Sequence, residues 1–288
     1  MHSDGPEQVG HWLRKDEMER RLRVLVLATA VMLIYAAAPT SAASPPLAGV
    51  TETTGWNHES APVRPDQEAT AARKLQLLQQ YTVAAQRREQ GMSSDLTAAT
   101  VYTVPTYERE QDKDYYCGPA AVQDVADFAW NMGKTANKYP QQKISNNWTK
   151  TDYYGQTLLV KEEAGANGAL EGSPKSAWSY NLYYLTSGAM FIGTAEVDII
   201  DGMPEFINLT PAWFDGNKWW RLPSWKSNFI GAHWVVGNGL NGDWDGTNGP
   251  QIQYDDGSAK QGGGTGTWWV GQLTMWKLIY NHHAAVVY

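Results

Sequence analysis

Apolar and polar positions follow helical spacing in the first half of the chain. Residues 68–90 are rich in helix-forming side chains and carry one apolar face, which predicts a helix that ends at Gly91. From Cys117 onward, apolar residues recur three and four positions apart, which predicts a helix with a buried stripe that ends near Gly133. Shorter helices are expected over residues 141–152 and in the aromatic stretch 176–185.

The second half carries short apolar or alternating runs separated by Gly, Pro and Asp, which is typical of strands joined by turns. These runs are residues 190–192, 205–209, 233–236, 251–254 and 267–270. Residues 96–107 alternate enough for a strand or an extended lead-in, and the glycine-rich stretch 165–173 is expected to separate elements. Helices followed by strands predict an α+β domain.

The N-terminal region has the pattern of a secretory signal. Basic residues at 20–23 precede an apolar run over 24–38, and the small residues after it suit cleavage after Ala42 or Ala43. The run is short for a membrane span, which needs roughly 20 residues, so an uncleaved anchor is the weaker alternative. We therefore expect a signal peptide at 1–43, a flexible leader with a helix at 44–109, and the main domain of a secreted protein at 110–288. The helix in the leader is either part of a pro-segment or a support helix.

The charge balance narrows the choice of partners. The net charge is −7, and no cluster of Lys and Arg occurs in the body of the chain. We therefore expect neither nucleic acid nor an anionic membrane surface as a partner. We also expect no stable membrane insertion after the signal peptide is cleaved.

Candidate chemistry centres on Cys117, the single cysteine of the chain, in the stretch Asp-Tyr-Tyr-Cys-Gly-Pro-Ala-Ala. At the start of a helix, the positive end of the helix dipole favours a thiolate. Gln111, six residues earlier, carries an amide that can donate to an oxyanion. A lone cysteine can also be an inert buried residue. The local motif favours a nucleophile.

A base for this thiol is found by elimination among the histidines. His58 lies in the polar leader, and the adjacent pair His282 and His283 cannot both point the same way from a strand. His233 begins a strong strand run, so it is the candidate base, although a histidine at a strand end is often structural.

A third group should orient the imidazole from the neighbouring strand. The loop after residue 237 reads as a hairpin connection, and the next strand ends in Asp255 and Asp256. Because side chains alternate along a strand, Asp256 shares a face with Ile252 and Tyr254, whereas Asp255 points to the other face. Asp256 is favoured, Asp255 is the close second, and both could simply be turn residues.

Gln111, Cys117-Gly-Pro-Ala-Ala, a strand headed by histidine and a following strand that ends in Asp together resemble the bacteriocin-processing, or double-glycine-leader, peptidase-like family. This is family thirty-nine of the papain-fold cysteine peptidases. The resemblance covers roughly residues 111–259. It implies a papain-like fold in which a helix carrying Cys117 packs on an antiparallel sheet, with His233 as base and Asp256 as its orienter. The family has Pro after this Asp, whereas Asp256 is followed by Gly257.

Other signals are weaker. The chain has 14 tryptophans, several of them around residues 213–234, which mark either core packing or a surface that binds sugars or peptides. Residues 241–246 superficially resemble the start of a calcium loop, but the twelfth position is Ile252, where a bidentate Glu is needed. Neither a metal nor another cofactor is expected.

The leading hypothesis is a secreted thiol hydrolase, a cysteine peptidase that acts on a peptide or protein. The alternatives are a peptidoglycan amidase or endopeptidase with the same triad, which would act on cell-wall material, and a tryptophan-rich binding protein without catalysis on the same scaffold.

Overall fold

The computed structural model describes residues 63–92, 101–151, 157–242, 250–261 and 263–288. Its helices are α2 (Glu68–Glu89), α3 (Cys117–Ala129), α4 (Gln141–Ile144), α5 (Leu159–Leu170), α6 (Gly188–Ile200) and α7 (Gln272–Tyr280), with a π-helical turn η1 (Ser145–Thr149) and a 3-10 turn η2 (Ala259–Gln261). Its strands are β1 (Val101–Thr103), β2 (Leu182–Tyr184), β3 (Glu205–Leu209), β4 (Ala212–Phe214), β5 (Trp219–Arg221), β6 (His233–Asn241), β7 (Gln251–Gly257), β8 (Thr265–Gly271) and β9 (Ala285–Val287). The described part of the chain is α+β, as the sequence predicts.

One antiparallel sheet organises these elements. Its strands follow the order β2-β9-β3-β6-β7-β8, and β1 pairs with the far end of β6. The β6–β7 pairing shifts register between Gly237 and Gly239. Strands β4 and β5 form a separate two-stranded hairpin.

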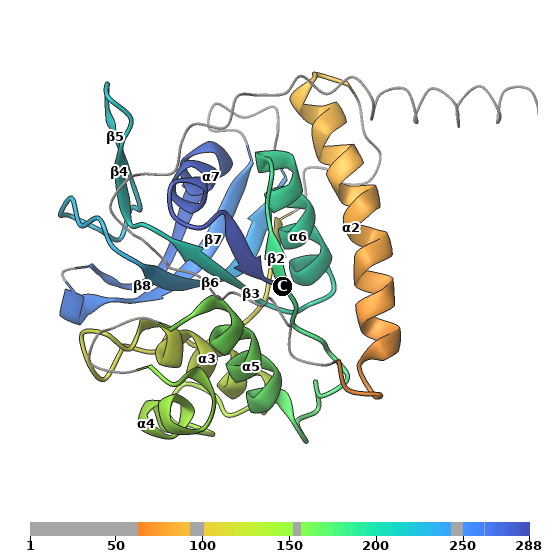
Figure 1. Ribbon diagram of the computed structural model, residues 1–288, viewed down its shortest axis with the longest axis vertical. Helices are drawn as coiled ribbons and strands as arrows, with labels where there is room; N and C mark the ends of the chain where they lie inside the picture. The colour runs from red at the N-terminus through yellow and green to blue at the C-terminus, as the bar shows by residue number, and fades with distance from the viewer. Residues whose placement is uncertain (1–62, 93–100, 152–156, 243–249, 262) are drawn as a thin grey trace, which may run out of the picture. The chain divides into compact units, whose positions relative to one another are not determined.

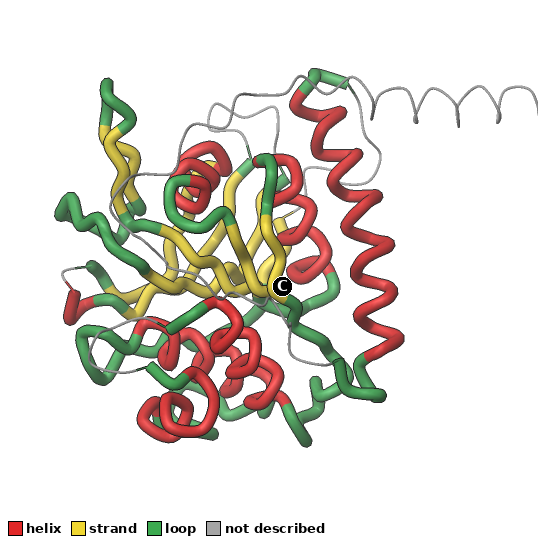
Figure 2. The backbone as a smooth tube through the Cα atoms, in the orientation of Figure 1, coloured by secondary structure: helices red, strands yellow, loops and turns green. Residues whose placement is uncertain are grey.

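Helices cover both faces of the sheet. Figures 1 and 2 show α3, α4 and α5 on one face and α6 and α7 on the other, with α2 alongside α6. Helix α3 packs on β6 and β7, the two strands in which the sequence places the candidate base and its orienter. This packing brings the start of α3 to the sheet.

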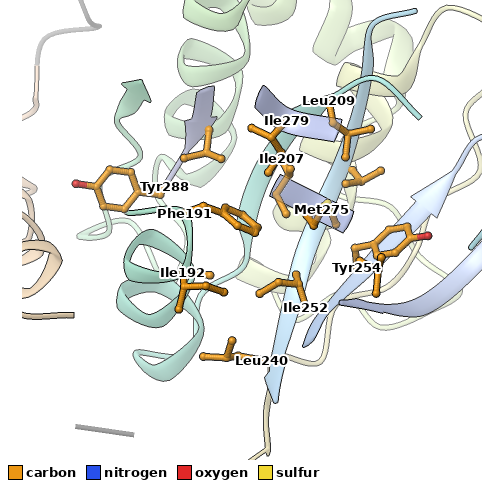
Figure 3. Close-up of a cluster of buried hydrophobic side chains, with 14 of the residues drawn as sticks. Phe191, Ile192, Ile207, Leu209, Leu240, Ile252, Tyr254, Met275, Ile279 and Tyr288 are labelled. Carbon is orange, nitrogen blue, oxygen red and sulfur yellow. The ribbon is translucent and has the colours of Figure 1, made fainter. Parts of the chain in front are cut away.

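The main hydrophobic cluster fills the space between the sheet and the helices α6 and α7 (Figure 3). Ile207 and Leu209 reach it from β3, Ile252 and Tyr254 from β7, and Phe191 from α6. The alternation of buried residues along β7 leaves Ile252, Tyr254 and Asp256 on a common face, as period-two spacing requires.

Most of the predicted elements are confirmed, with small shifts at their ends. The helix expected at 68–90 is α2, and strands form at 205–209, 233–236, 251–254 and 267–270. The helix that begins at Cys117 ends at Ala129, earlier than expected, because Asn131 already adopts a positive φ of 53°. The helix expected over 141–152 is α4 continued by η1.

Three predictions are wrong. The glycine-rich stretch 165–173 is not a break, since its first six residues belong to α5. Residues 190–192 lie in α6 and not in a strand, and the stretch 176–185 contains β2 in place of a helix. Helix α6 is buried on nearly all sides, so its sequence has no polar face from which helical periodicity could be recognised.

The predicted signal peptide, the leader up to residue 62 and most of the calcium-like loop lie outside the described residues. Among the helices described, none is both long enough and apolar enough to cross a membrane.

Candidate active site

Cys117 is the first residue of α3 and is 5% exposed. The apolar face of α3 anchors the helix on the sheet, and Pro119 is tolerated because first-turn N–H groups have no partner within a helix. Tyr116, the residue before the helix, supplies no side-chain cap. Cys117 therefore lies at the positive end of the helix dipole. The N-cap side chain does not offset that partial charge.

His233 is the first residue of β6 and is paired in register with Leu209 of β3. Its imidazole is almost fully buried and lies edge-on to Trp225, with ring centroids 5.2 Å apart. Nε2 lies 2.9 Å from Oδ1 of Asp256. Nδ1 forms no conventional hydrogen bond. The ring is thus held from one nitrogen and left available at the other.

Asp256 is completely buried and accepts several hydrogen bonds. Besides His233, its donors are the Ser224 hydroxyl at 2.6 Å, the Trp225 indole N–H at 2.9 Å and the Ser258 backbone N–H at 3.0 Å. Such donors make a buried carboxylate tolerable and fix its orientation. Asp256 can therefore stay charged beside the imidazole.

The charges of these groups support one another. Burial lowers the pKa of His233, but the Asp256 carboxylate and the nearby Cys117 side chain outweigh burial and raise it to about 10. Burial tends to raise the pKa of Asp256, yet the His233 charge and the hydrogen bonds hold it below its usual range. At neutral pH the pair is imidazolium and carboxylate, which is the state that favours a thiolate next to it.

Asp255, the second candidate for the orienting residue, points elsewhere. Its carboxylate accepts from the hydroxyls of Thr106 and Thr267, at 2.6 and 2.5 Å. The structure therefore brings Asp256, and not Asp255, to His233.

Gln111 lies beside Cys117, and the two residues line a cavity of about 10 Å³ together with Trp234. The Gln111 side chain is 1% exposed, and neither its Nε2 nor its Oε1 has a partner. Its backbone N–H donates to the carbonyl of Gly257 at 3.0 Å, which ties the Gln111 segment to the end of β7. The cavity is about the size of a single water molecule, and the Gln111 side chain among its lining residues has an amide without a hydrogen-bond partner.

The residue after Asp256, Gly257, lies too close to another segment of the backbone to carry a side chain. A Cβ there would lie 2.0 Å from the backbone oxygen of Arg109. The chain leading to Gln111 crosses β7 so closely that only glycine fits.

Sequence reasoning missed two kinds of residue at this site. Ser224 and Trp225 hold Asp256 from the loop before β6, and Glu162 of α5 lies buried against the first turn of α3. Trp225 belongs to a recognisable tryptophan cluster, whereas a serine in a loop and a glutamate in a helix carry no signal of their own.

Of the other histidine candidates, the structure describes the adjacent pair His282 and His283. His282 follows α7, and burial together with the charge of His283 lowers its pKa to about 3. Within the described residues, no group of three or more His, Cys, Asp or Glu side chains is arranged to hold a metal ion.

Comparisons with known proteins leave the family open. No family model matches the chain, and no curated protein matches it. Among solved structures, it is similar to xylellain, a cysteine protease from Xylella fastidiosa, at 12% identity and a TM-score of 0.39 over 66% of this chain and 84% of that one. A likeness this weak supports no argument about function, which therefore rests on the geometry of the site.

Proposed function

We propose that the protein is a cysteine hydrolase that cleaves a peptide or amide bond with Cys117 as nucleophile, His233 as acid and base, Asp256 as its orienter and Gln111 as oxyanion donor. The observation that carries the proposal is the buried His233–Asp256 pair, joined at 2.9 Å. The Cys117 side chain is near enough to this imidazole to raise its pKa, and the other ring nitrogen, Nδ1, has no conventional hydrogen-bond partner. The helix–sheet arrangement also fits a papain-like scaffold of the bacteriocin-processing type.

The chemistry follows from the charge state. The Cys117 thiolate attacks the substrate carbonyl carbon, and the new oxyanion is held by the Gln111 amide and the Cys117 backbone N–H. His233 gives its Nδ1 proton to the leaving nitrogen as the C–N bond breaks, which leaves a thioester. The neutral imidazole then takes a proton from water, the resulting hydroxide attacks the thioester, and the acid product leaves as the thiolate–imidazolium pair is restored.

Two measurements test this mechanism. Iodoacetamide should alkylate Cys117 in the folded wild type near neutral pH, and turnover of a peptide library should be lost in Cys117→Ser. Gln111→Ala should lower kcat by about 10²–10³ while leaving alkylation unchanged, because the amide acts on the oxyanion and not on the thiolate. Absence of alkylation in the folded wild type would contradict the proposal.

The substrate class is proposed as a peptide or protein outside the cell, in line with the expected signal peptide. A peptidoglycan amide is chemically equivalent at the scissile bond, and the triad treats both alike. Hydrolysis of purified peptidoglycan compared with casein-derived peptides separates the two.

A second candidate function, binding without catalysis, is favoured by one observation. A hollow of about 410 Å³ at the β4–β5 hairpin is lined by Trp219, Trp220 and Trp225 together with Lys218 and Arg221. Aromatic walls of this kind stack on sugar rings or on peptide side chains. If Cys117→Ala pulls down glycans as well as the wild type does, and no hydrolysis is detected with either, the binding function replaces the catalytic one.

A further inference from the structure

Trp225 is shared between the candidate active site and the hollow at the β4–β5 hairpin. Its indole N–H donates to Asp256 at 2.9 Å, and its ring lies edge-on to His233, with ring centroids 5.2 Å apart. The same residue is 2% exposed and lines the hollow of about 410 Å³. The near wall of the hollow is therefore only about one indole ring away from the imidazole.

The hollow lies on the leaving-group side of the site. In the proposed mechanism His233 gives a proton to the leaving nitrogen, whereas Gln111 holds the oxyanion beside Cys117. The hollow adjoins His233 through Trp225 and shares no lining residue with the cavity that contains Cys117 and Gln111. Because an extended chain advances about 3.3–3.6 Å per residue, the hollow receives the substrate about two or three residues after the scissile bond.

The hollow is positively charged in a protein that is acidic as a whole. Lys218 and Arg221 line it, no Asp or Glu is among its lining residues, and the net charge of the chain is −7. Among the residues that the structure describes, no carboxylate forms an ion pair with either cation. The carboxylate of Asp215 instead accepts from the Trp220 indole at 2.6 Å and from the backbone N–H groups of Asn217 and Lys218 at 2.9 Å, which orders the hairpin.

Neutral groups hold both cations in place. Nζ of Lys218 lies 3.7 Å from the centroid of the Trp220 ring. The guanidinium of Arg221 donates to the carbonyl of Lys226 at 3.1 Å and to Oδ1 of Asn228 at 2.6 Å, while its Nε has no hydrogen-bond partner. These contacts orient the two cations without cancelling their charge. A carboxylate is the group that complements such a pair, because it accepts hydrogen bonds from both guanidinium and ammonium.

We propose that the hollow is a substrate subsite that binds a carboxylate two or three residues after the scissile bond, between Lys218 and Arg221 and against the indole walls. The inference rests on the proposed function, because it describes the substrate that Cys117 cleaves. The carboxylate belongs either to an acidic side chain of a longer peptide or to the free C-terminus of a short leaving fragment. Binding energy gained at this remote position raises kcat/KM for such substrates.

Cleavage of a peptide library by the wild type tests this subsite. Mass spectrometry of the released fragments identifies the residues that follow each scissile bond. We expect either Asp and Glu, or the end of the fragment, to be enriched at the second or third of these residues.

Four synthetic versions of one cleaved sequence then distinguish the two sources of the carboxylate. Two are long peptides with Glu or Gln at the enriched position, and two end at that position with a free acid or an amide. In at least one of these pairs the carboxylate should raise kcat/KM by about fivefold. High salt should reduce the difference, because it screens exposed charges.

The double variant Lys218→Gln with Arg221→Gln removes both charges and should abolish the preference. The ratio of kcat/KM within a pair isolates the charge, because a general loss of activity affects both peptides alike. Lys226→Gln is the matched control: this lysine is exposed in the loop after β5 and does not line the hollow, so the preference should stay. If the double variant does not fold, as judged by circular dichroism, Lys218→Gln alone takes its place and should weaken the preference, since this side chain is exposed.

The outcomes separate this inference from the proposed function. Equal kcat/KM within both pairs for the wild type overturns the inference while leaving a hydrolase. A preference that survives in the double variant, or that Lys226→Gln removes, also overturns it, because the charges responsible are then not those of the hollow. A wild type that cleaves no library peptide and is not alkylated at Cys117 overturns the proposed function itself.

Discussion

At the scale of single residues, burial disfavours the charged forms of the side chains in the site, and specific partners offset that effect. The imidazole of His233 would be neutral at this depth if it stood alone, because burial lowers its pKa. The Asp256 carboxylate raises the pKa of His233 again. It can stay charged and do so because Ser224, Trp225 and Ser258 donate hydrogen bonds to it. The positive charge near Cys117 is therefore a product of several residues acting together.

Replacing Asp256 by Asn should remove that charge. Without the carboxylate, the two largest contributions that hold the pKa of His233 at about 10 are gone and burial lowers it, so the imidazolium is disfavoured and the thiolate loses its partner. We expect thiolate absorbance at pH 7 to disappear and kcat/KM to fall by at least about a hundredfold.

The control for this change is Asp255→Asn, which alters the neighbouring carboxylate that pairs with Thr106 and Thr267. It should keep the thiolate signal of the wild type. If Asp255→Asn removes the signal and Asp256→Asn does not, the orienting role belongs to Asp255.

Some of the candidate site follows from the sequence. The single cysteine, the scarcity of histidines and the period-two spacing along β7 are enough to nominate Cys117, His233 and Asp256. Glu162 could not be nominated in this way, because a helical glutamate reads as a solvated residue until the fold buries it. What the sequence does not contain is the packing that changes the charge state of such a residue.

At the scale of elements, glycines explain an error in the sequence-based prediction. The glycines of residues 165–173 suggest a break, yet Gly165 and Gly168 lie inside α5. A Cβ on Gly165 would be 2.8 Å from Thr149, and one on Gly168 would be 2.5 Å from the indole nitrogen of Trp148. These glycines let η1 pack closely on α5, a requirement of tertiary structure that a local propensity cannot reveal.

Gly168→Ala should therefore destabilise the protein although alanine is the better helix former. Overpacking against Trp148 is expected to lower the free energy of unfolding by about 1–3 kcal/mol. Gly188→Ala, at the start of α6, is the matched control, since a Cβ there would meet its nearest neighbours at an ordinary 3.4 Å. That variant should stay within about 0.5 kcal/mol of the wild type. Equal urea unfolding midpoints for the two variants would contradict the packing argument.

At the scale of the whole described unit, helix α2 is bound to the rest by buried charges. Lys74 of α2 is 1% exposed, lies 3.0 Å from Oδ1 of Asp198 in α6 and donates to the carbonyl of Ser179 at 2.9 Å. Arg88, near the other end of α2, pairs with Glu196 at 2.5 Å. The sequence leaves open whether this helix belongs to a pro-segment or is a support helix, and these contacts favour the support helix.

The prediction that follows concerns Lys74→Met. Burial raises the pKa of Asp198 to about 7 even with Lys74 beside it, and it holds the pKa of Glu205 well above its usual range. Loss of the lysine charge leaves both carboxyls without their cation, and breaking a buried pair in this way costs about 3–5 kcal/mol. Their pKa values in the folded state rise further, so the folded variant binds protons more tightly than the unfolded chain does. Its stability should therefore fall as pH rises.

Urea unfolding at pH 5 and pH 7 measures this effect. The loss in Lys74→Met should be larger at pH 7 than at pH 5, because protonated carboxyls no longer need the cation. Arg73→Met is the control: its 2.8 Å pair with Asp201 involves a side chain that is 59% exposed, and the loss should stay below about 1 kcal/mol at both pH values. If Lys74→Met is no more harmful than Arg73→Met, the buried pair does not hold α2 in place, and removal of the helix on activation becomes energetically reasonable.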